Sequence, residues 1–185
     1  VVTKDDLVEA IRRSGVREGD LIFVHSSLSA FGHVLGAAAT MVDAILEAVG
    51  LKGTVLVPAF TGGTVYGDGI LPRRRDLQPY HRGLTLCWTG IVPRTFLKRS
   101  GVVRSAHPSH SVAGLGPLAE QCLKDQRAED PPAGLTSAFA RLVEFGGKIV
   151  YLGVPLAVST FLHYLETKLN LPYLTDAVCW VLDEC

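Results

Sequence analysis

The chain has 185 residues, and its 18 basic and 18 acidic side chains cancel to a formal net charge of zero. This length suits one domain with a substantial core. The balanced charge gives no global field toward nucleic acid or a membrane surface, so we expect neither as a partner. Four widely spaced cysteines without a C-x-x-C pair argue against a zinc module or disulfide framework: Cys87, Cys122, Cys179 and Cys185.

No apolar run is long enough to span a bilayer, and the N-terminus lacks the pattern of a signal peptide. We therefore expect a cytoplasmic protein. The chain begins at Val1 and stops at Cys185 directly after a strand-like segment. We expect a single domain over residues 1–185, truncated at its C-terminus, and the oligomeric state stays open.

Apolar runs at residues 21–24, 54–58 and 148–152 predict buried strands, and Ser111 to Gly114 predicts a short one. Capping residues and apolar stripes predict helices after Thr3, at 37–49, at 91–98, from Pro117, after Ser137 and after Ser159. The strand, helix, strand order over residues 21–58 indicates neighbouring parallel strands, and hence an α/β fold.

A polar cluster, His25-Ser26-Ser27-Leu28-Ser29, follows the first predicted strand. Open α/β sheets bind ligands at the carboxyl ends of their strands, which makes this cluster a candidate binding site. The alternative is a connection rich in turn formers. The following glycines match neither a phosphate-binding loop nor a dinucleotide fingerprint.

Residues 59–89 show no period and predict a long irregular loop of the kind used for binding. Arg73-Arg74-Arg75 in this loop could contact cofactor phosphates, although short charge runs are more often solvated. Asp68 and Asp76 could meet a cationic substrate.

The segment from Val103 to Ser111 joins one arginine, two histidines and three serines around a proline. A histidine fixed beside hydroxyl groups is a candidate for proton transfer near neutral pH. The alternative is a solvated turn at Pro108, whose side chains bond their own backbone.

Thr160, His163 and Glu166 fall at three-residue steps and therefore share one face of the last predicted helix. The carboxylate could orient His163, or a histidine brought from elsewhere in the fold. The alternative is an ordinary polar stripe on an amphipathic helix.

Three segments in this order resemble the antibiotic N-acetyltransferase family, whose best-known members are aminoglycoside 3-N-acetyltransferases. They are His25-Ser26-Ser27-Leu28, Arg104-Ser105-Ala106-His107-Pro108 with Ser111, and Gly153 followed by residues 160–166. The resemblance runs from about Asp5 to Tyr173. It implies a central mixed, largely parallel sheet flanked by helices. It also implies acetyl-CoA as co-substrate, no metal, and acetyl transfer to a primary amine such as the 3-amino group of an aminoglycoside antibiotic.

Carried over residue by residue, the resemblance implies that His107 is the catalytic histidine, supported by Glu166. The residues implied to contact coenzyme A are Ser26, Ser27, Leu28, Arg104, Ser105, Ser111, Ser137 and Phe139. A small cationic amine could meet Asp68, His163 and Tyr66. The sequence departs from the family pattern at Ala138, where proline is usual, and at Arg94, where an acidic residue is common.

In this interpretation His107 removes a proton from the ammonium substrate, and groups near Ser26 and Ser27 receive the oxyanion. Direct transfer in a ternary complex is preferred. An acyl-cysteine route would need Cys87, whose neighbours Leu86 and Trp88 suggest an inert thiol.

Three other functions stay open at this point. A metal-dependent hydrolase would use His25, His107, His163 and Glu166, although their spacing is not that of a strong ligand set. A non-catalytic relative would bind coenzyme A without turnover. A related acetyltransferase would modify a different amine.

Overall fold

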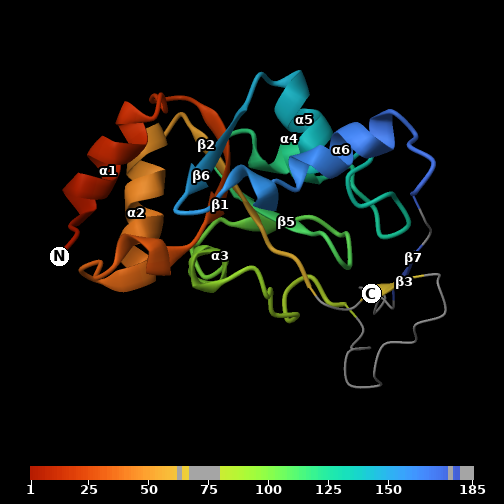
Figure 1. The fold of residues 1–185 in the computed structure, drawn as a ribbon, viewed down its shortest axis with the longest axis horizontal. Helices are drawn as coiled ribbons and strands as arrows, with labels where there is room; N and C mark the ends of the chain where they lie inside the picture. The colour runs from red at the N-terminus through yellow and green to blue at the C-terminus, as the bar shows by residue number, and fades with distance from the viewer. Residues whose placement is uncertain (62–63, 67–79, 175–176, 180–185) are drawn as a thin grey trace.

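The computed structural model describes residues 1–61, 64–66, 80–174 and 177–179. Its central feature is a five-stranded sheet of order β4-β5-β2-β1-β6 (Figure 1). The strands are β1 (Leu21–Ser26), β2 (Thr54–Pro58), β4 (Val103–Arg104), β5 (Val112–Leu115) and β6 (Lys148–Leu152). The strands β3 (Thr64–Tyr66) and β7 (Ala177–Cys179) form a separate antiparallel pair.

The sheet is mixed and largely parallel, which confirms the predicted fold. β1 pairs in parallel with β2 and with β6, whereas β5 is antiparallel to both β2 and β4. Only β5 therefore runs against the other four strands. The carboxyl ends of β1, β2 and β6 lie at the same edge of the sheet.

Helices cover both faces of the sheet (Figure 1). Side chains of α1 (Lys4–Arg13), α2 (Ala37–Val49) and α3 (Ile91–Phe96) belong to one apolar core. Side chains of α4 (Ala119–Leu123), α5 (Ala138–Glu144) and α6 (Phe161–Lys168) belong to a second. Strand β1 contributes side chains to both cores. Ile22 and Val24 point into the first core, whereas Leu21 and Phe23 point into the second.

Two predicted helix starts have different outcomes. The hydroxyl of Thr3 accepts the N–H of Asp6, and the Asp6 carboxylate accepts the N–H of Thr3, so the first start is confirmed as a capping box. The cap predicted at Ser159 is wrong, because the helix begins one residue later, after Thr160. A short 3-10 turn, η3 (Leu156–Val158), comes first, and the Ser159 hydroxyl pairs with that of Tyr151 at 2.6 Å.

Within the described residues, no helix combines the length and apolar character needed to cross a membrane. Asp68, Asp76 and the Arg73–Arg75 triplet lie outside the described residues. The backbone of Tyr66 lies in β3, but its side chain is likewise outside the description.

Candidate active site

A cavity of about 540 Å³ opens at the carboxyl ends of β1, β2 and β6. This is the edge of the sheet where the sequence predicts a binding site. Its lining comes from the end of β1 and η1 (Leu28–Phe31), from the end of β2, from the segment before α3, and from the segment after β6. The lining residues are His25, Ser26, Ser27, Leu28, Ser29, Pro58, Phe60, Trp88, Thr89, Gly90, Ile91, Val92, Val154 and Val158.

The polar side of the cavity is the His25-Ser26-Ser27 segment. The buried Nε2 of His25 and the hydroxyl of Ser26 have no hydrogen-bond partner within the described part of the chain. The His25 ring stacks on Tyr151, with ring centroids 5.6 Å apart. Burial lowers the pKa of His25 to about 4, so this imidazole is neutral at physiological pH. The polar side of the lining thus consists of one neutral histidine and neighbouring serine residues.

The opposite wall is the segment from Trp88 to Val92, which hydrogen bonds hold against the end of β2. The backbone N–H of Trp88 donates to the Phe60 carbonyl at 2.9 Å, and the Thr89 hydroxyl donates to the Pro58 carbonyl at 2.6 Å. From α3, Nε of Arg94 donates to the Cys87 carbonyl at 2.6 Å. This anchored segment leaves the Trp88 side chain 62% exposed.

His107 lies outside the cavity lining and is only 3% exposed. Its Nδ1 accepts the backbone N–H of His110 at 3.0 Å, so the ring proton must be on Nε2, which donates to the Asp130 carbonyl at 3.1 Å. Desolvation lowers the pKa of His107 to about 4. Both ring nitrogens are therefore occupied in a neutral imidazole.

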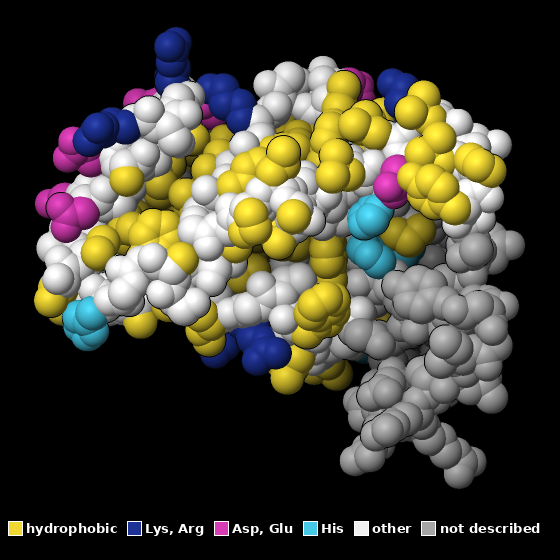
Figure 2. Space-filling model, in the orientation of Figure 1, with side chains coloured by type: hydrophobic (Ala, Val, Ile, Leu, Met, Phe, Trp, Pro, Cys, Tyr) yellow, Lys and Arg dark blue, Asp and Glu magenta, His cyan; other side chains and the backbone are white. Residues whose placement is uncertain are grey.

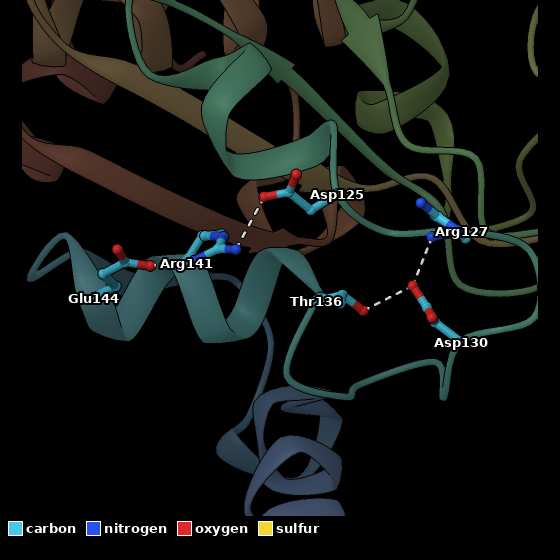
Figure 3. A network of polar contacts seen from close by, with 6 residues as sticks. All are labelled: Asp125, Arg127, Asp130, Thr136, Arg141 and Glu144. Atoms are coloured by element: carbon cyan, nitrogen blue, oxygen red, sulfur yellow. Dashed lines mark hydrogen bonds and ion pairs between the residues drawn. The ribbon is translucent and has the colours of Figure 1, made fainter.

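The loop that receives His107 is braced by polar contacts (Figure 3). The Asp130 carboxylate accepts the backbone N–H of Arg127 at 2.7 Å and the Thr136 hydroxyl at 2.8 Å. Nearby, Arg141 pairs with Asp125 at 2.9 Å and with Glu144. These contacts make His107 a buried link between two loops.

Arg104 is also buried, and its guanidinium makes four hydrogen bonds within the protein. It donates to the Ser111 hydroxyl at 3.0 Å and to the carbonyls of Ala59 at 2.7 Å, Thr85 at 2.6 Å and Arg82 at 3.1 Å. Its charged end also lies over the Tyr80 ring, 5.3 Å from the centroid. The side chain therefore ties three segments of backbone together.

The other residues expected to contact the cofactor divide into two groups. Ser26, Ser27 and Leu28 line the cavity, and their contact with the cofactor stays a prediction. Ser105, Ser111, Ser137 and Phe139 are at most 1% exposed, and the three hydroxyls bond backbone groups. For this second group, and for Arg104, the structure describes a role in holding the fold, and cofactor contact stays a prediction.

Glu166 pairs with His163, and not with His107. Its Oε2 lies 2.6 Å from Nδ1 of His163, and its Oε1 accepts the Tyr173 hydroxyl at 3.1 Å. The hydrogen bond to His163 holds the pKa of Glu166 below its usual value, so the carboxylate is ionised. No hydrogen bond within the described residues joins Glu166 to His107, and the expected support of His107 by this carboxylate stays a prediction.

The ring of His110 is close to His107 and to the wall of the cavity. Its ring centroid is 6.0 Å from that of His107 and 4.8 Å from that of Phe60, which lines the cavity. Burial, followed by the charges of His107 and His163, lowers the pKa of His110 to about 4. The face of α6 that carries His163 and Glu166 is thus electrostatically linked to the segment from His107 to His110.

The ligands of the alternative metal site are not gathered. Among the described residues, no group of three or more histidine, cysteine, aspartate or glutamate side chains is arranged to hold a metal ion. His25 lines the cavity, His107 bonds a main-chain carbonyl, and His163 bonds Glu166.

Sequence reasoning missed the apolar part of the lining, namely Phe60, Trp88, Ile91, Val154 and Val158. The prediction of a binding loop over residues 59–89 was the only signal for two of them. Ile91 lies at the start of a predicted helix, Val154 and Val158 lie beside predicted elements, and none of the three has a distinguishing pattern.

Known proteins resemble this chain in sequence and in structure. A sequence model of the family described as aminoglycoside 3-N-acetyltransferase matches residues 23–183. Aminoglycoside N(3)-acetyltransferase III of Acinetobacter baumannii is 37% identical over 179 residues, covering 92% of this chain and 62% of that protein.

Two solved structures of other proteins are also similar to this chain. That of AAC-IIIb in a binary complex with CoASH has a TM-score of 0.79 and 32% identity, over 89% of this chain and 64% of that one. That of AAC-VIa bound to sisomicin has a TM-score of 0.80 and 30% identity, over the same shares of the two chains. The chain thus spans about three fifths of the length of these proteins.

Proposed function

Because this chain belongs to the aminoglycoside 3-N-acetyltransferase family, we propose that it transfers an acetyl group from acetyl-CoA to a primary amine. The acceptor is the 3-amino group of an aminoglycoside antibiotic, which the modification inactivates. The observation that carries the proposal is the cavity at the carboxyl ends of β1, β2 and β6, with the family's His-Ser-Ser segment on its polar side.

The cavity is the proposed site of the acyl donor. Ser26 and Ser27 contribute polar residues to the lining, and Leu28, Ile91 and Val158 contribute apolar ones. This mixture suits the pantetheine arm of coenzyme A, which carries both amide and apolar groups. The similar AAC-IIIb was solved with CoASH bound.

The proposed base is His163. An ammonium group has no lone pair, so a base must remove a proton before the amine can attack a thioester. Ionised Glu166 has no proton to donate, so Nδ1 of His163 must donate, which leaves a lone pair on Nε2. His107 is less suited, because both of its ring nitrogens are already bonded.

The proposed reaction assigns one role to each of these groups. The ammonium group first loses one proton to solvent through His163, and Nε2 of His163 then takes a second proton as the amine nitrogen forms a bond to the acetyl carbonyl carbon. The negative charge that develops on the carbonyl oxygen is stabilised by N–H or O–H groups of the His25 to Ser27 segment. The carbon–sulfur bond breaks, the imidazolium returns its proton to the thiolate, and the products are the amide and coenzyme A.

The acceptor assignment is supported by the family and by the similar AAC-VIa, which was solved with sisomicin. The exposed side of α6 suits a cationic amine, because ionised Glu166 gives it a negative charge. An amine bound at the exposed side of α6 would lie beside His163, the proposed base.

Release of free thiol from acetyl-CoA, measured with sisomicin and then with simple primary amines, tests this function. We expect thiol release that depends on the acceptor, and a product heavier by one acetyl group at one amino position. Calorimetric titration with CoA on the same protein separates the alternatives. Binding without thiol release for any amine would identify a non-catalytic relative, and release with simple amines alone would assign a different acceptor.

A further inference from the structure

Resting on the proposed function, we propose that Trp88 is a binding residue for the acyl donor and contacts the pantetheine arm of coenzyme A. We also propose that Arg94 positions it. The family motifs single out neither residue for cofactor binding. Trp88 is an exposed indole on a hydrogen-bonded backbone at the wall of the cavity.

Exposed apolar side chains surround this cavity. Trp88, Ile91 and Val158 all line it, although they are 62%, 54% and 45% exposed. Figure 2 shows that apolar side chains gather in patches on the face that it draws. Apolar surface that meets a cavity costs free energy in water unless a ligand covers it, so such a rim is typical of a binding groove.

The backbone around Trp88 is held by hydrogen bonds with two other segments, the end of β2 and helix α3. Its own N–H bonds the Phe60 carbonyl, and the Thr89 hydroxyl bonds the Pro58 carbonyl. Arg94 extends from α3 and donates through Nε to the carbonyl of Cys87, the residue before Trp88. An aromatic side chain on an anchored backbone loses little further conformational entropy when a ligand covers it.

The geometry favours the pantetheine arm over the nucleotide. Trp88 belongs to the same cavity as Ser26 and Ser27, where the thioester reacts in the proposed mechanism. The arm leads directly from the thioester, and its dimethyl group and methylene groups suit an indole face. Arg94 matters because its hydrogen bond to the Cys87 carbonyl ties the residue before Trp88 to α3.

Two titrations test the proposal, one with CoA and one with pantetheine, which lacks the nucleotide. We expect Trp88→Ala to raise both dissociation constants by the same factor, about tenfold, with little change in kcat. Trp88→Phe keeps an aromatic ring and should recover most of the affinity. Arg94→Ala should raise both constants by a smaller factor, of about threefold.

Leu86→Ala is the matched control. Leu86 is 76% exposed and two residues from Trp88, but it does not line the cavity, so both affinities should stay unchanged. In a Trp180→Phe background, Trp88 is the only tryptophan, and either ligand should shield its fluorescence from acrylamide.

The outcomes separate this inference from the proposed function. If the unmodified protein does not bind CoA, both are wrong. If it binds CoA and Trp88→Ala leaves the affinity for CoA and pantetheine unchanged, only the inference about Trp88 is wrong. Weaker binding of CoA alone, with pantetheine unaffected, would place Trp88 against the nucleotide and overturn its assignment to the arm.

Discussion

Oε2 of Glu166 lies 2.6 Å from Nδ1 of His163, three residues earlier on α6. The carboxylate fixes the tautomer of the imidazole and would stabilise its protonated form during turnover. The side chain of His163 is 61% exposed, so its Nε2 can contact a substrate that binds from solution. This relationship makes His163 the residue on which the proposed mechanism depends.

Replacing His163 with alanine should lower kcat by about two to four orders of magnitude and leave the affinity for CoA near normal. The reason is that the substitution removes the base without touching the cavity lining. Glu166→Gln should lower kcat less, because the imidazole remains but loses its ionic partner. Steady-state kinetics with acetyl-CoA and sisomicin, together with CoA titrations, measure both effects.

His33→Ala is the control for this prediction, since His33 is exposed and does not line the cavity. It should leave kcat unchanged. Turnover by His163→Ala at the unmodified rate would exclude this histidine as the base and leave His107 as the candidate base.

Much of the fold could be predicted because its signals are local. The runs at 21–24, 54–58 and 148–152 are continuous and apolar, as strands buried on both faces must be, and each lies within a strand of the sheet. The prediction of a binding segment at His25 also depended on a local signal, a dense polar cluster at a strand end. The structure places that segment in the cavity lining.

The buried structural role of His107 could not be predicted from the sequence, because the contact that reveals it is made with a backbone carbonyl. His107 bonds the carbonyl of Asp130, and Arg104 bonds carbonyls of residues far away in sequence. A main-chain acceptor leaves no side-chain signature, so sequence alone could not distinguish these buried links from groups at the site. The same holds for Trp88, whose anchors are also main-chain carbonyls.

The stability of the protein should fall as the pH is lowered from about 6.5 toward 4. Burial holds the pKa of His25, His107 and His110 at about 4, below the ordinary value of 6.5. Between these values the unfolded chain binds more protons, so the free energy of unfolding rises with pH and is largest above 6.5. Urea unfolding at a series of pH values measures the effect.

A variant at His107 assigns part of this dependence to one residue. His107→Gln keeps an N–H donor for the Asp130 carbonyl but cannot titrate, so the slope should flatten by up to about 1.4 kcal/mol per pH unit. His33→Gln, at an exposed site, should leave the slope unchanged. An identical slope in His107→Gln would mean that His107 is not held neutral in the folded protein.

Arg104→Met should lower the free energy of unfolding by about 3 kcal/mol or more. The substitution keeps apolar bulk but removes four hydrogen bonds of a charged group, and hydrogen bonds to charged groups are worth about 1.5–3 kcal/mol each. Arg104→Lys should also destabilise, because one ammonium cannot reproduce the planar fork of donors.

Urea unfolding compares these variants with Arg13→Met, which removes an exposed arginine from α1. That control should change stability by less than about 0.5 kcal/mol. If Arg104→Met were equally mild, the buried network would have no measurable role in stability.

Gly153→Ala should damage the cavity as well as the fold. Gly153 has a φ of +70°, and an added Cβ would lie 2.5 Å from Cβ of Ala30 and 2.9 Å from the carbonyl oxygen of Ser27. Gly146 has a φ of +64° but has no atom within 4 Å of an added Cβ, so Gly146→Ala carries the backbone strain alone.

We expect about 1–2 kcal/mol of destabilisation from that strain in both variants. Gly153→Ala should cost further stability and weaken CoA binding, because the segment that it displaces lines the cavity. Equal stability losses with unchanged CoA affinity would show that the packing of Gly153 against Ser27 does not position the site.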